Sequence, residues 1–346
     1  MIQNFGACSP SAADHFKKYK TCLTHSELRT LAHAYNKIVK MYNSTKNKKT
    51  KEKKESEEDH IIYKEIPLHK FKSFKMLYNA LNERFSKVCG MEKDQCWIEQ
   101  DIFKKNYHDL YQYLSKNFRP VMKSSWVKNQ RELLETFDIL KVMKQYEAAY
   151  GKFSFLGVFP MDFMKKKDSS QCIVGEICKI DLVNLFKKGK SCIGLVLNFD
   201  PHDQPGSHWV ACFADFDPDS PKYGFFYYDS FAEEEPREVQ EFYKIIEKQF
   251  RELHESDRKT ATNYRSKPFL FERNQTRHQY KNTECGMFSM VFLILSLEHP
   301  KLNEKQICEK SITQRSDDLV NSLRNTLFRK KNFKTISSFN LFQVYK

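Results

Sequence analysis

One cysteine of the chain is placed for nucleophilic chemistry. Cys285 opens an apolar run, residues 285–297, that is predicted to be a buried helix. A cysteine at a helix N-terminus faces the positive end of the helix dipole, which favours the thiolate, the nucleophilic form of the side chain. Gly286 follows it and would let a substrate backbone approach. Cys285 is therefore the best candidate nucleophile, although a lone cysteine of this kind is more often a buried structural residue.

A base and an orienting acid stand at the ends of two predicted strands. His208 begins one strand and Asp229 ends the next. Neighbouring strands that end together place a carboxylate beside an imidazole, where it holds the tautomer and stabilises the imidazolium. Gln279 lies six residues before Cys285, so its amide could donate to a developing oxyanion together with the Cys285 N–H. Each of these residues alone is an ordinary turn, strand-end or solvated side chain, and their order and spacing single them out.

Three other histidines compete for the role of base, namely His202, His254 and His278. His202 lies in a loop rich in Pro and Asp, which would hold a base poorly. Trp209, next to His208, would by itself be a core residue.

The composition is typical of a globular chain in a reducing environment. The 346 residues are 40% hydrophobic, enough for two domains with sizeable cores. No signal peptide is visible, and no apolar run approaches the roughly 18 residues of a membrane span. We therefore expect the ten cysteines to be free thiols. The gaps Cys89/Cys96 and Cys172/Cys178 are too wide for a zinc knuckle, so no metal or cofactor is expected.

The elements that position the candidate residues fall into two regions. Residues 1–120 are expected to form a mostly helical accessory domain, with a capping-box pair at Thr24 and Glu27 and a mobile charged loop at 43–60. Residues 121–346 are expected to form the core domain, an α+β fold with a strand cluster packed on a central helix. Further helices are predicted over 72–88, 107–114, 133–150, 236–253 and 317–328, and strands over 193–199, 209–216, 223–228 and 268–272.

Positive charge is concentrated in the first region. Residues 1–120 hold 23 Lys and Arg against 14 Asp and Glu, a net charge of +9 out of +14 for the chain. Such a region could contact nucleic acid or an acidic surface. The simpler explanation is that the lysines keep the chain soluble.

The whole pattern resembles a known family. A His-Trp pair, an acidic residue about twenty positions on, and Gln-x5-Cys-Gly are similar to the adenain and SUMO-protease clan of cysteine peptidases. Within the clan the chain resembles the polyprotein-processing proteases of large nucleocytoplasmic DNA viruses, such as that of African swine fever virus. The resemblance covers about residues 126–330 and is weaker over the first 120. The matching stretches are 153–163, 194–200, 206–213, 227–230 and 277–289.

The resemblance implies a fold and a set of roles. The fold would be a papain-like or adenain-like core, with a mixed central sheet packed on a buried helix that carries the nucleophile. Cys285 would be the nucleophile, His208 the general base, Asp229 its orienting acid, and Gln279 part of the oxyanion hole. Trp209 would cover a tunnel that admits only Gly-Gly. Asn198 would position substrate, although a strand-end asparagine capping a turn is an equal explanation.

The resemblance also implies a biological setting. The substrates would be viral capsid or core polyproteins, cut after Gly-Gly during virion maturation, in the viral factory of the host cytoplasm and in the virion. The basic N-terminal domain would dock substrate or nucleic acid.

Three other functions remain open. The same chemistry would serve removal of SUMO or ubiquitin from host proteins, or acetyl transfer, although no acyl-CoA site is recognisable. A basic nucleic-acid-binding protein on an inactive protease scaffold would have lost the nucleophile or the base, and both are present here.

Overall fold

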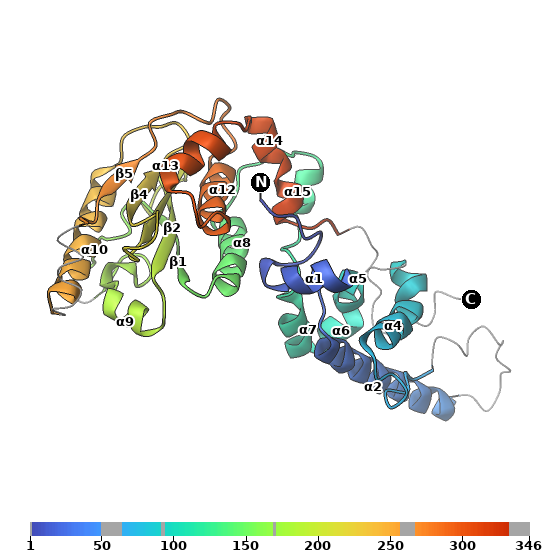
Figure 1. Cartoon of the computed structure of the whole chain (residues 1–346). Helices are drawn as coiled ribbons and strands as arrows, with labels where there is room; N and C mark the ends of the chain where they lie inside the picture. Colours follow the sequence, from blue (N-terminus) through green and yellow to red (C-terminus); the bar gives the residue numbers. More distant parts are fainter. Residues whose placement is uncertain (1, 50–63, 91–93, 169–170, 257–266, 332–346) are drawn as a thin grey trace. The chain divides into compact units, whose positions relative to one another are not determined.

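The structure is a computed structural model of the chain (Figure 1), and it describes residues 2–49, 64–90, 94–168, 171–256 and 267–331. It divides into two compact units. Among the described residues, one unit contains 2–4 and Met122–Phe328, and the other contains Phe5–Val121 and 329–331. Each unit therefore includes a short segment from the opposite end of the chain, which the sequence analysis does not anticipate.

The first unit is built on a five-stranded mixed sheet in the order β1-β2-β3-β4-β5. The two central pairings, β2 with β3 and β3 with β4, are antiparallel, whereas the outer pairings are parallel. The strands are β1 Phe153–Pro160, β2 Cys192–Asn198, β3 Trp209–Asp215, β4 Gly224–Tyr228 and β5 Phe271–Arg273. The four strands predicted from sequence are confirmed to within a few residues, and β1 is an additional strand.

Helices cover both faces of this sheet (Figure 1). Alternate residues of a strand point to opposite faces, and apolar side chains on both faces pack against these helices. On one face Val196, Ala211 and Phe213 pack in one core with helices α8 (Thr136–Ala149) and α12 (Cys285–Glu298). On the other face Ile193, Leu195 and Val210 pack with α9 (Leu182–Lys187) and α10 (Arg237–Ser256). The predicted α+β class, with a mixed sheet packed on a buried helix that begins at Cys285, is confirmed.

The C-terminal part of this unit contains short helices, α13 (Glu304–Ile307), α14 (Asp317–Ser322) and α15 (Arg324–Leu327), with a π-helix at Cys308–Ile312. The single helix predicted over 317–328 is therefore broken after Ser322. Short 3-10 turns lie at Ser124–Val127 and Ile177–Lys179.

The second unit is helical. It contains a 3-10 turn at Pro10–Ala12, followed by α1 Ala13–Tyr19, α2 His25–Lys49, α4 Phe74–Cys89, α5 Asp94–Glu99, α6 Asp101–Asn106 and α7 His108–Ser115. The predicted capping box is present: Thr24 N donates to Glu27 Oε2 at 2.7 Å, and Glu27 N donates to Thr24 Oγ1 at 3.3 Å.

The expected mobile loop at 43–60 is wrong at its start. Helix α2 continues through residue 49, because lysine has a high helix propensity and a solvated helix end needs no apolar face. The rest of the loop, from residue 50 on, lies outside the described residues.

The expectation that all ten cysteines are free thiols is also wrong. Three disulfides join Cys8 to Cys22, Cys89 to Cys96 and Cys172 to Cys178, with Cα atoms 5.2, 5.7 and 5.6 Å apart. The inference rested on the expected compartment, whereas pairing requires proximity in the fold, and these distances fall within bridging range. Four cysteines are free and buried, namely Cys192, Cys212, Cys285 and Cys308.

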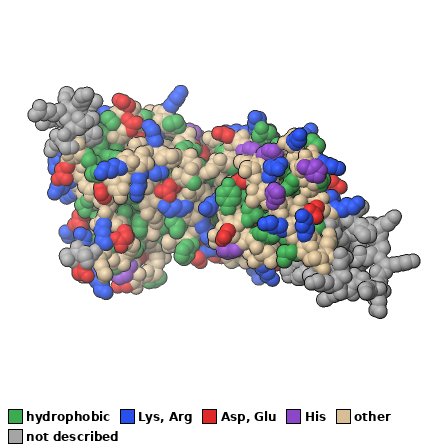
Figure 2. Space-filling model, turned by 90° about the horizontal axis from the view of Figure 1, so that it is seen from below, with side chains coloured by type: hydrophobic (Ala, Val, Ile, Leu, Met, Phe, Trp, Pro, Cys, Tyr) green, Lys and Arg blue, Asp and Glu red, His purple; other side chains and the backbone are tan. Residues whose placement is uncertain are grey.

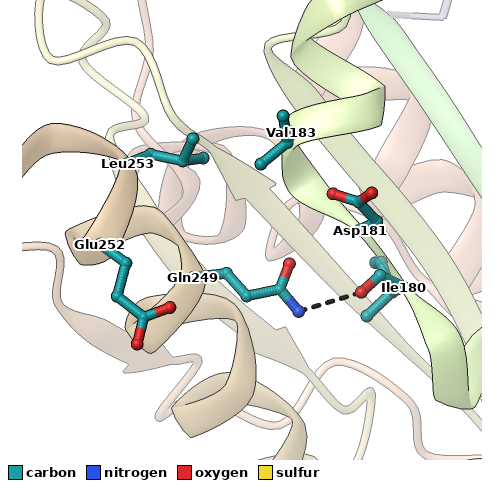
Figure 3. Close-up of a pocket in the computed structure, with 6 residues that line it drawn as sticks. All are labelled: Ile180, Asp181, Val183, Gln249, Glu252 and Leu253. Atoms are coloured by element: carbon teal, nitrogen blue, oxygen red, sulfur yellow. Dashed lines mark hydrogen bonds between the residues drawn. The ribbon is translucent and has the colours of Figure 1, made fainter. Parts of the chain in front are cut away.

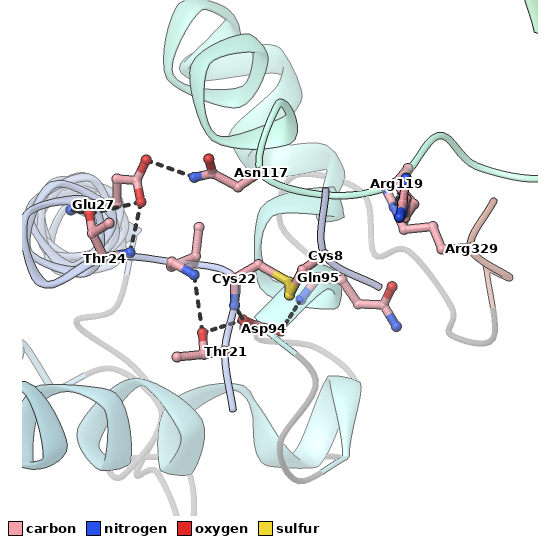
Figure 4. Close-up of a disulfide and its surroundings, with 11 residues drawn as sticks. Cys8, Thr21, Cys22, Thr24, Glu27, Asp94, Gln95, Asn117, Arg119 and Arg329 are labelled. Atoms are coloured by element: carbon pink, nitrogen blue, oxygen red, sulfur yellow. Dashed lines mark hydrogen bonds between the residues drawn. A yellow bond between two sulfur atoms is a disulfide. The ribbon is translucent and has the colours of Figure 1, made fainter. Parts of the chain in front are cut away.

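The Cys8–Cys22 disulfide lies in a polar network that orders the start of the helical unit (Figure 4). Asp94 is almost fully buried and accepts the Cys22 N–H at 3.0 Å and the Thr21 hydroxyl. Burial raises the pKa of the Asp94 carboxyl, although these hydrogen bonds oppose the shift. The disulfide and the carboxylate therefore hold the same short segment.

Candidate active site

The sheet topology brings His208 and Asp229 together. Because β3 and β4 are antiparallel, with Ala211 opposite Tyr228, the residue before β3 lies beside the residue after β4. His208 Nε2 and Asp229 Oδ1 are 2.6 Å apart. The two residues predicted as base and orienting acid therefore lie within hydrogen-bond distance of each other, and their roles remain predictions.

Asp229 is held in place by backbone groups and is fully buried. Its Oδ1 also accepts the N–H of Phe231 at 3.0 Å, and its Oδ2 accepts the N–H of Glu233 at 3.1 Å. The Asn274 side chain accepts from Asp229 N at 3.0 Å and donates to Asp229 O at 2.7 Å. A carboxylate fixed in this way can orient the imidazole without moving itself.

The His208 ring also contacts the candidate nucleophile. Burial by itself would lower the pKa of His208, but hydrogen bonds to Asp229 and Cys285 outweigh it and raise this pKa from 6.5 to about 9. Phe231 stacks on the ring with centroids 4.8 Å apart. His208 is therefore imidazolium at neutral pH, the form that pairs with a thiolate.

Cys285 is the first residue of α12, as predicted, and it is almost fully buried. One turn further along, the Ser289 hydroxyl donates to the Trp209 carbonyl at 3.1 Å. This bond ties the start of the helix to the start of β3, directly beside His208. The helix N-terminus and the strand end that carry the two reacting groups are thus joined by a buried hydrogen bond.

Gln279 lies in the segment between β5 and α12, and its side chain is fully buried. Its Oε1 accepts a hydrogen bond from the Ser230 hydroxyl at 2.7 Å, and its Nε2 donates to the Lys281 carbonyl. The backbone N–H of Gln279 donates to Ser230 O at 2.9 Å. The amide is therefore held by Ser230, the residue after Asp229, and its predicted place in the oxyanion hole remains a prediction.

Trp209 and Asn198 are paired residues of β3 and β2, and they line one groove of about 680 Å³. The groove also takes in the Leu134 segment and the loop around Gly206. Trp209 Nε1 donates to Leu134 O at 3.1 Å, which fixes the indole. Asn198 Oδ1 accepts from Asp200 N at 3.1 Å, which is the turn-capping contact expected from sequence.

Gly286 lies against Trp209 and Leu134. A Cβ built on Gly286 would lie 3.1 Å from Trp209 Cδ1 and 3.2 Å from Leu134 Cβ. The absence of a side chain therefore lets the indole approach the helix start closely. Its predicted contact with a substrate backbone remains a prediction.

A second pocket, of about 310 Å³, lies between α9 and α10 (Figure 3). Gln249 crosses it, donating from Nε2 to Ile180 O at 2.9 Å and accepting from Leu182 N at 3.0 Å. These bonds use both ends of the amide to join the two helices. The pocket contains none of the candidate catalytic residues.

Two of the competing histidines, His202 and His278, contact other residues. His202 Nδ1 is 2.6 Å from Asp162 Oδ2 on the exposed loop. His278 is bracketed by the Tyr228 hydroxyl at 3.1 Å and the Thr313 hydroxyl at 3.2 Å, and burial lowers its pKa to about 4. The His254 side chain lies outside the described ones.

Sequence reasoning missed several supporting residues. Asp317 accepts the N–H groups of Tyr280 at 3.1 Å and Lys281 at 3.2 Å. Glu284, directly before the nucleophile, is fully buried, and its carboxylate lies 3.6 Å from the Arg324 guanidinium. Only the position of Glu284 next to Cys285 could have drawn attention to it, because the other partners are distant in sequence.

Among the described residues, no group of three His, Cys, Asp or Glu side chains is arranged to hold a metal ion. Within the same ranges no helix has the length and apolarity to cross a membrane.

Comparison with known proteins agrees with this geometry. Residues 181–330, which include His208, Asp229, Gln279 and Cys285, match the model of the Ulp1 protease family, C-terminal catalytic domain. A putative thiol protease of Acanthamoeba polyphaga mimivirus is 28% identical over 323 residues, which is 93% of each chain. A cysteine protease of African swine fever virus is 25% identical over 277 residues, covering 78% of this chain and 94% of the relative.

A solved structure shows the same fold. The crystal structure of the African swine fever virus protease aligns with a TM-score of 0.52 at 21% identity, over 75% of this chain and 91% of the other. The matched family model, the named relatives and the fold lead to one conclusion. The chain is a cysteine protease, and its residues 181–330 are similar to the catalytic domain of the Ulp1 protease family.

Proposed function

We propose that Cys285, His208, Asp229 and Gln279 carry out peptide hydrolysis by two acyl transfers. The Cys285 thiolate attacks the scissile carbonyl carbon, and the negative oxygen accepts hydrogen bonds from Gln279 and the Cys285 N–H. His208 gives its proton to the leaving amine as the C–N bond breaks. His208 then removes a proton from water, which attacks the thioester and releases the acid product and the free thiol.

The observation that carries this proposal is the position of His208 between Asp229 and the start of α12. Its Nε2 lies 2.6 Å from Asp229 Oδ1, and the bond from the Ser289 hydroxyl to Trp209 O holds the start of β3 beside the helix turn that begins at Cys285. The arrangement matches what a thiol protease needs before substrate binds.

The Cys285→Ala variant tests the proposal, with Cys212→Ala as its control. Cys212 is a free cysteine of β3 that is also buried, so both variants lose one buried thiol. Cys285→Ala should lose peptide cleavage entirely, while Cys212→Ala should keep it. Full cleavage by Cys285→Ala would end the assignment.

The proposed substrates are viral structural polyproteins cut after Gly-Gly. Support comes from Trp209, whose indole lies against the start of α12 at Gly286 and lines the groove beside it. We propose that this indole excludes substrate residues with a Cβ. Candidate capsid polyproteins should be incubated with the enzyme and the new ends mapped by mass spectrometry; cuts after residues other than Gly-Gly would refute this substrate class.

A second substrate class has its own support. One African swine fever virus relative, 25% identical over 284 residues, is named a SUMO-1 cysteine protease. We therefore also propose ubiquitin-like conjugates as the alternative substrate. Cleavage rates of a SUMO fusion and of a polyprotein fragment, measured side by side, discriminate between the two.

Nucleic acid is a proposed partner of the basic helical unit. The exposed Lys17, Lys18 and Lys20 near the exposed Tyr19 support it. Figure 2 shows positive and negative side chains mixed over the surface, which argues against a strongly positive binding site on that face. Adding DNA to a purified cleavage assay should raise the rate if the partner is real, and an unchanged rate would discard it. Detection of the enzyme in purified virions and viral factories would test the proposed location.

A further inference from the structure

The Gln279 amide is clamped at both ends. Lys281 offers a carbonyl, which can only accept, so the atom that faces it must be the amide nitrogen. The amide oxygen then faces Ser230, whose hydroxyl donates to it at 2.7 Å. The orientation of the side chain is thus determined by its partners and does not depend on how its two end atoms are assigned.

One hydrogen of the amide remains for chemistry. An –NH₂ group has two donors, and the Lys281 carbonyl uses one of them. The other is the donor that the proposed oxyanion role of Gln279 requires. Its direction is determined by the plane of the amide, and the Ser230 hydroxyl sets that plane from the opposite side.

Ser230 also holds the backbone of the same segment. Its carbonyl accepts the N–H groups of His278 at 2.8 Å and Gln279 at 2.9 Å. Ser230 directly follows Asp229, and both are fully buried. Two consecutive residues after β4 therefore have different partners: Asp229 contacts the His208 imidazole, and Ser230 holds the Gln279 amide.

We propose that the Ser230 hydroxyl is a positioning residue that aims the Gln279 amide at the developing oxyanion. The inference rests on the proposed role of Gln279. Without the hydroxyl, the buried Oε1 would lack its partner, and the amide could rotate away from the reacting carbonyl. The backbone bonds from Ser230 O would remain, so the loss would be confined to the side chain.

The first experiment compares Ser230→Ala with Ser296→Ala. Ser296 is a buried serine of α12 whose hydroxyl donates to Phe292 O at 3.0 Å, so the control also loses one buried hydroxyl bond. Removal of a whole oxyanion donor costs about 10²–10³ in kcat. We expect misalignment in Ser230→Ala to lower kcat by about 10- to 100-fold with little change in KM, and Ser296→Ala to lower it less than about twofold.

Alkylation of Cys285 by iodoacetamide separates alignment from general damage. Alkylation displaces iodide from carbon and forms no oxyanion, so its rate should be unchanged in Ser230→Ala. A kcat within twofold of wild type would overturn the proposal. Equal losses of kcat and alkylation would overturn it too, because they would indicate a disturbed fold around the thiol.

The double variant Ser230→Ala/Gln279→Ala tests the route of action. If Ser230 acts through Gln279, the double variant should be no slower than Gln279→Ala alone. An additional loss would contradict the proposal. Full activity of Gln279→Ala would instead refute the oxyanion role itself, and the proposal for Ser230 with it. If Ser230→Ala fails to fold, Ser230→Cys, which keeps the volume but donates weakly, must show the same selective loss of kcat.

Discussion

Basic side chains near the two ends of β3 have pKa values shifted in opposite directions. At the start of the strand, His208 is in direct contact with Asp229, and its pKa is raised to about 9. Near the other end, burial lowers the pKa of Lys222, although the charges of Glu304 and Asp215 oppose this shift. Burial also raises the pKa of Glu304 to about 8. The two ends differ in the partner of the base: His208 contacts the carboxyl group of Asp229, whereas Lys222 Nζ donates to the backbone carbonyls of His299 and Leu302.

This comparison shows what an active site needs beyond a buried acid and a buried base. Burial alone favours the neutral forms of both. Hydrogen bonds to Asp229 and Cys285 reverse that preference for the imidazole of His208 and raise its pKa. At the other end of the strand, Lys222 bonds to backbone carbonyls and holds structure.

The largest expected effect comes from breaking the contact at the catalytic end. Asp229→Asn removes the charge that raises the pKa of His208, so this pKa should fall from about 9 toward 6.5. We expect kcat/KM at pH 7.5 to fall by at least about 100-fold. The alkaline limb of the pH–activity profile should also move to lower pH. An alkaline limb that stays in place would show that Asp229 does not hold the proton on His208.

An intermediate effect is expected from Lys222→Met, which tests the role of the lysine near the C-terminal end of β3. The Leu302 carbonyl would lose the donor at Lys222 Nζ, whereas the His299 carbonyl would keep the N–H of Leu302, and we expect a cost of about 1–3 kcal/mol in the free energy of unfolding. Urea unfolding at pH 7 measures this cost. The pH–activity profile should be unchanged, and a shifted profile would mean that the two ends are coupled.

A smaller, pH-dependent effect is expected at Glu304. Its folded pKa is about 8, above the ordinary 4.5, so its neutral form stabilises the fold below pH 4.5, and this stability is lost as the pH rises through 8. Glu304→Gln should remove that dependence and gain on the order of 1 kcal/mol over wild type between pH 5 and pH 8. Parallel stability curves for the two proteins would contradict this.

Sequence order was enough to single out His208, Asp229 and Cys285 as candidate reacting groups. His208 and Asp229 stand at the ends of strands with strongly apolar sequences, and Cys285 opens an apolar helix, so topology alone brings them together. The partner of Gln279 was not predictable, because Ser230 is 49 residues away and a pattern of residue types carries no hydrogen-bond geometry. Pairing of Cys8 with Cys22 was missed for a similar reason, since only the folded distance decides it.

The rate of alkylation at Cys285 tests the proposed pairing of Cys285 with His208 most directly. Wild type and His208→Ala would be treated with iodoacetamide at pH 6.5, and modification of each cysteine would be followed by mass spectrometry. Because the imidazolium stabilises the thiolate, Cys285 should react at least about tenfold faster in wild type than in the variant. Equal rates in the two proteins would contradict the account.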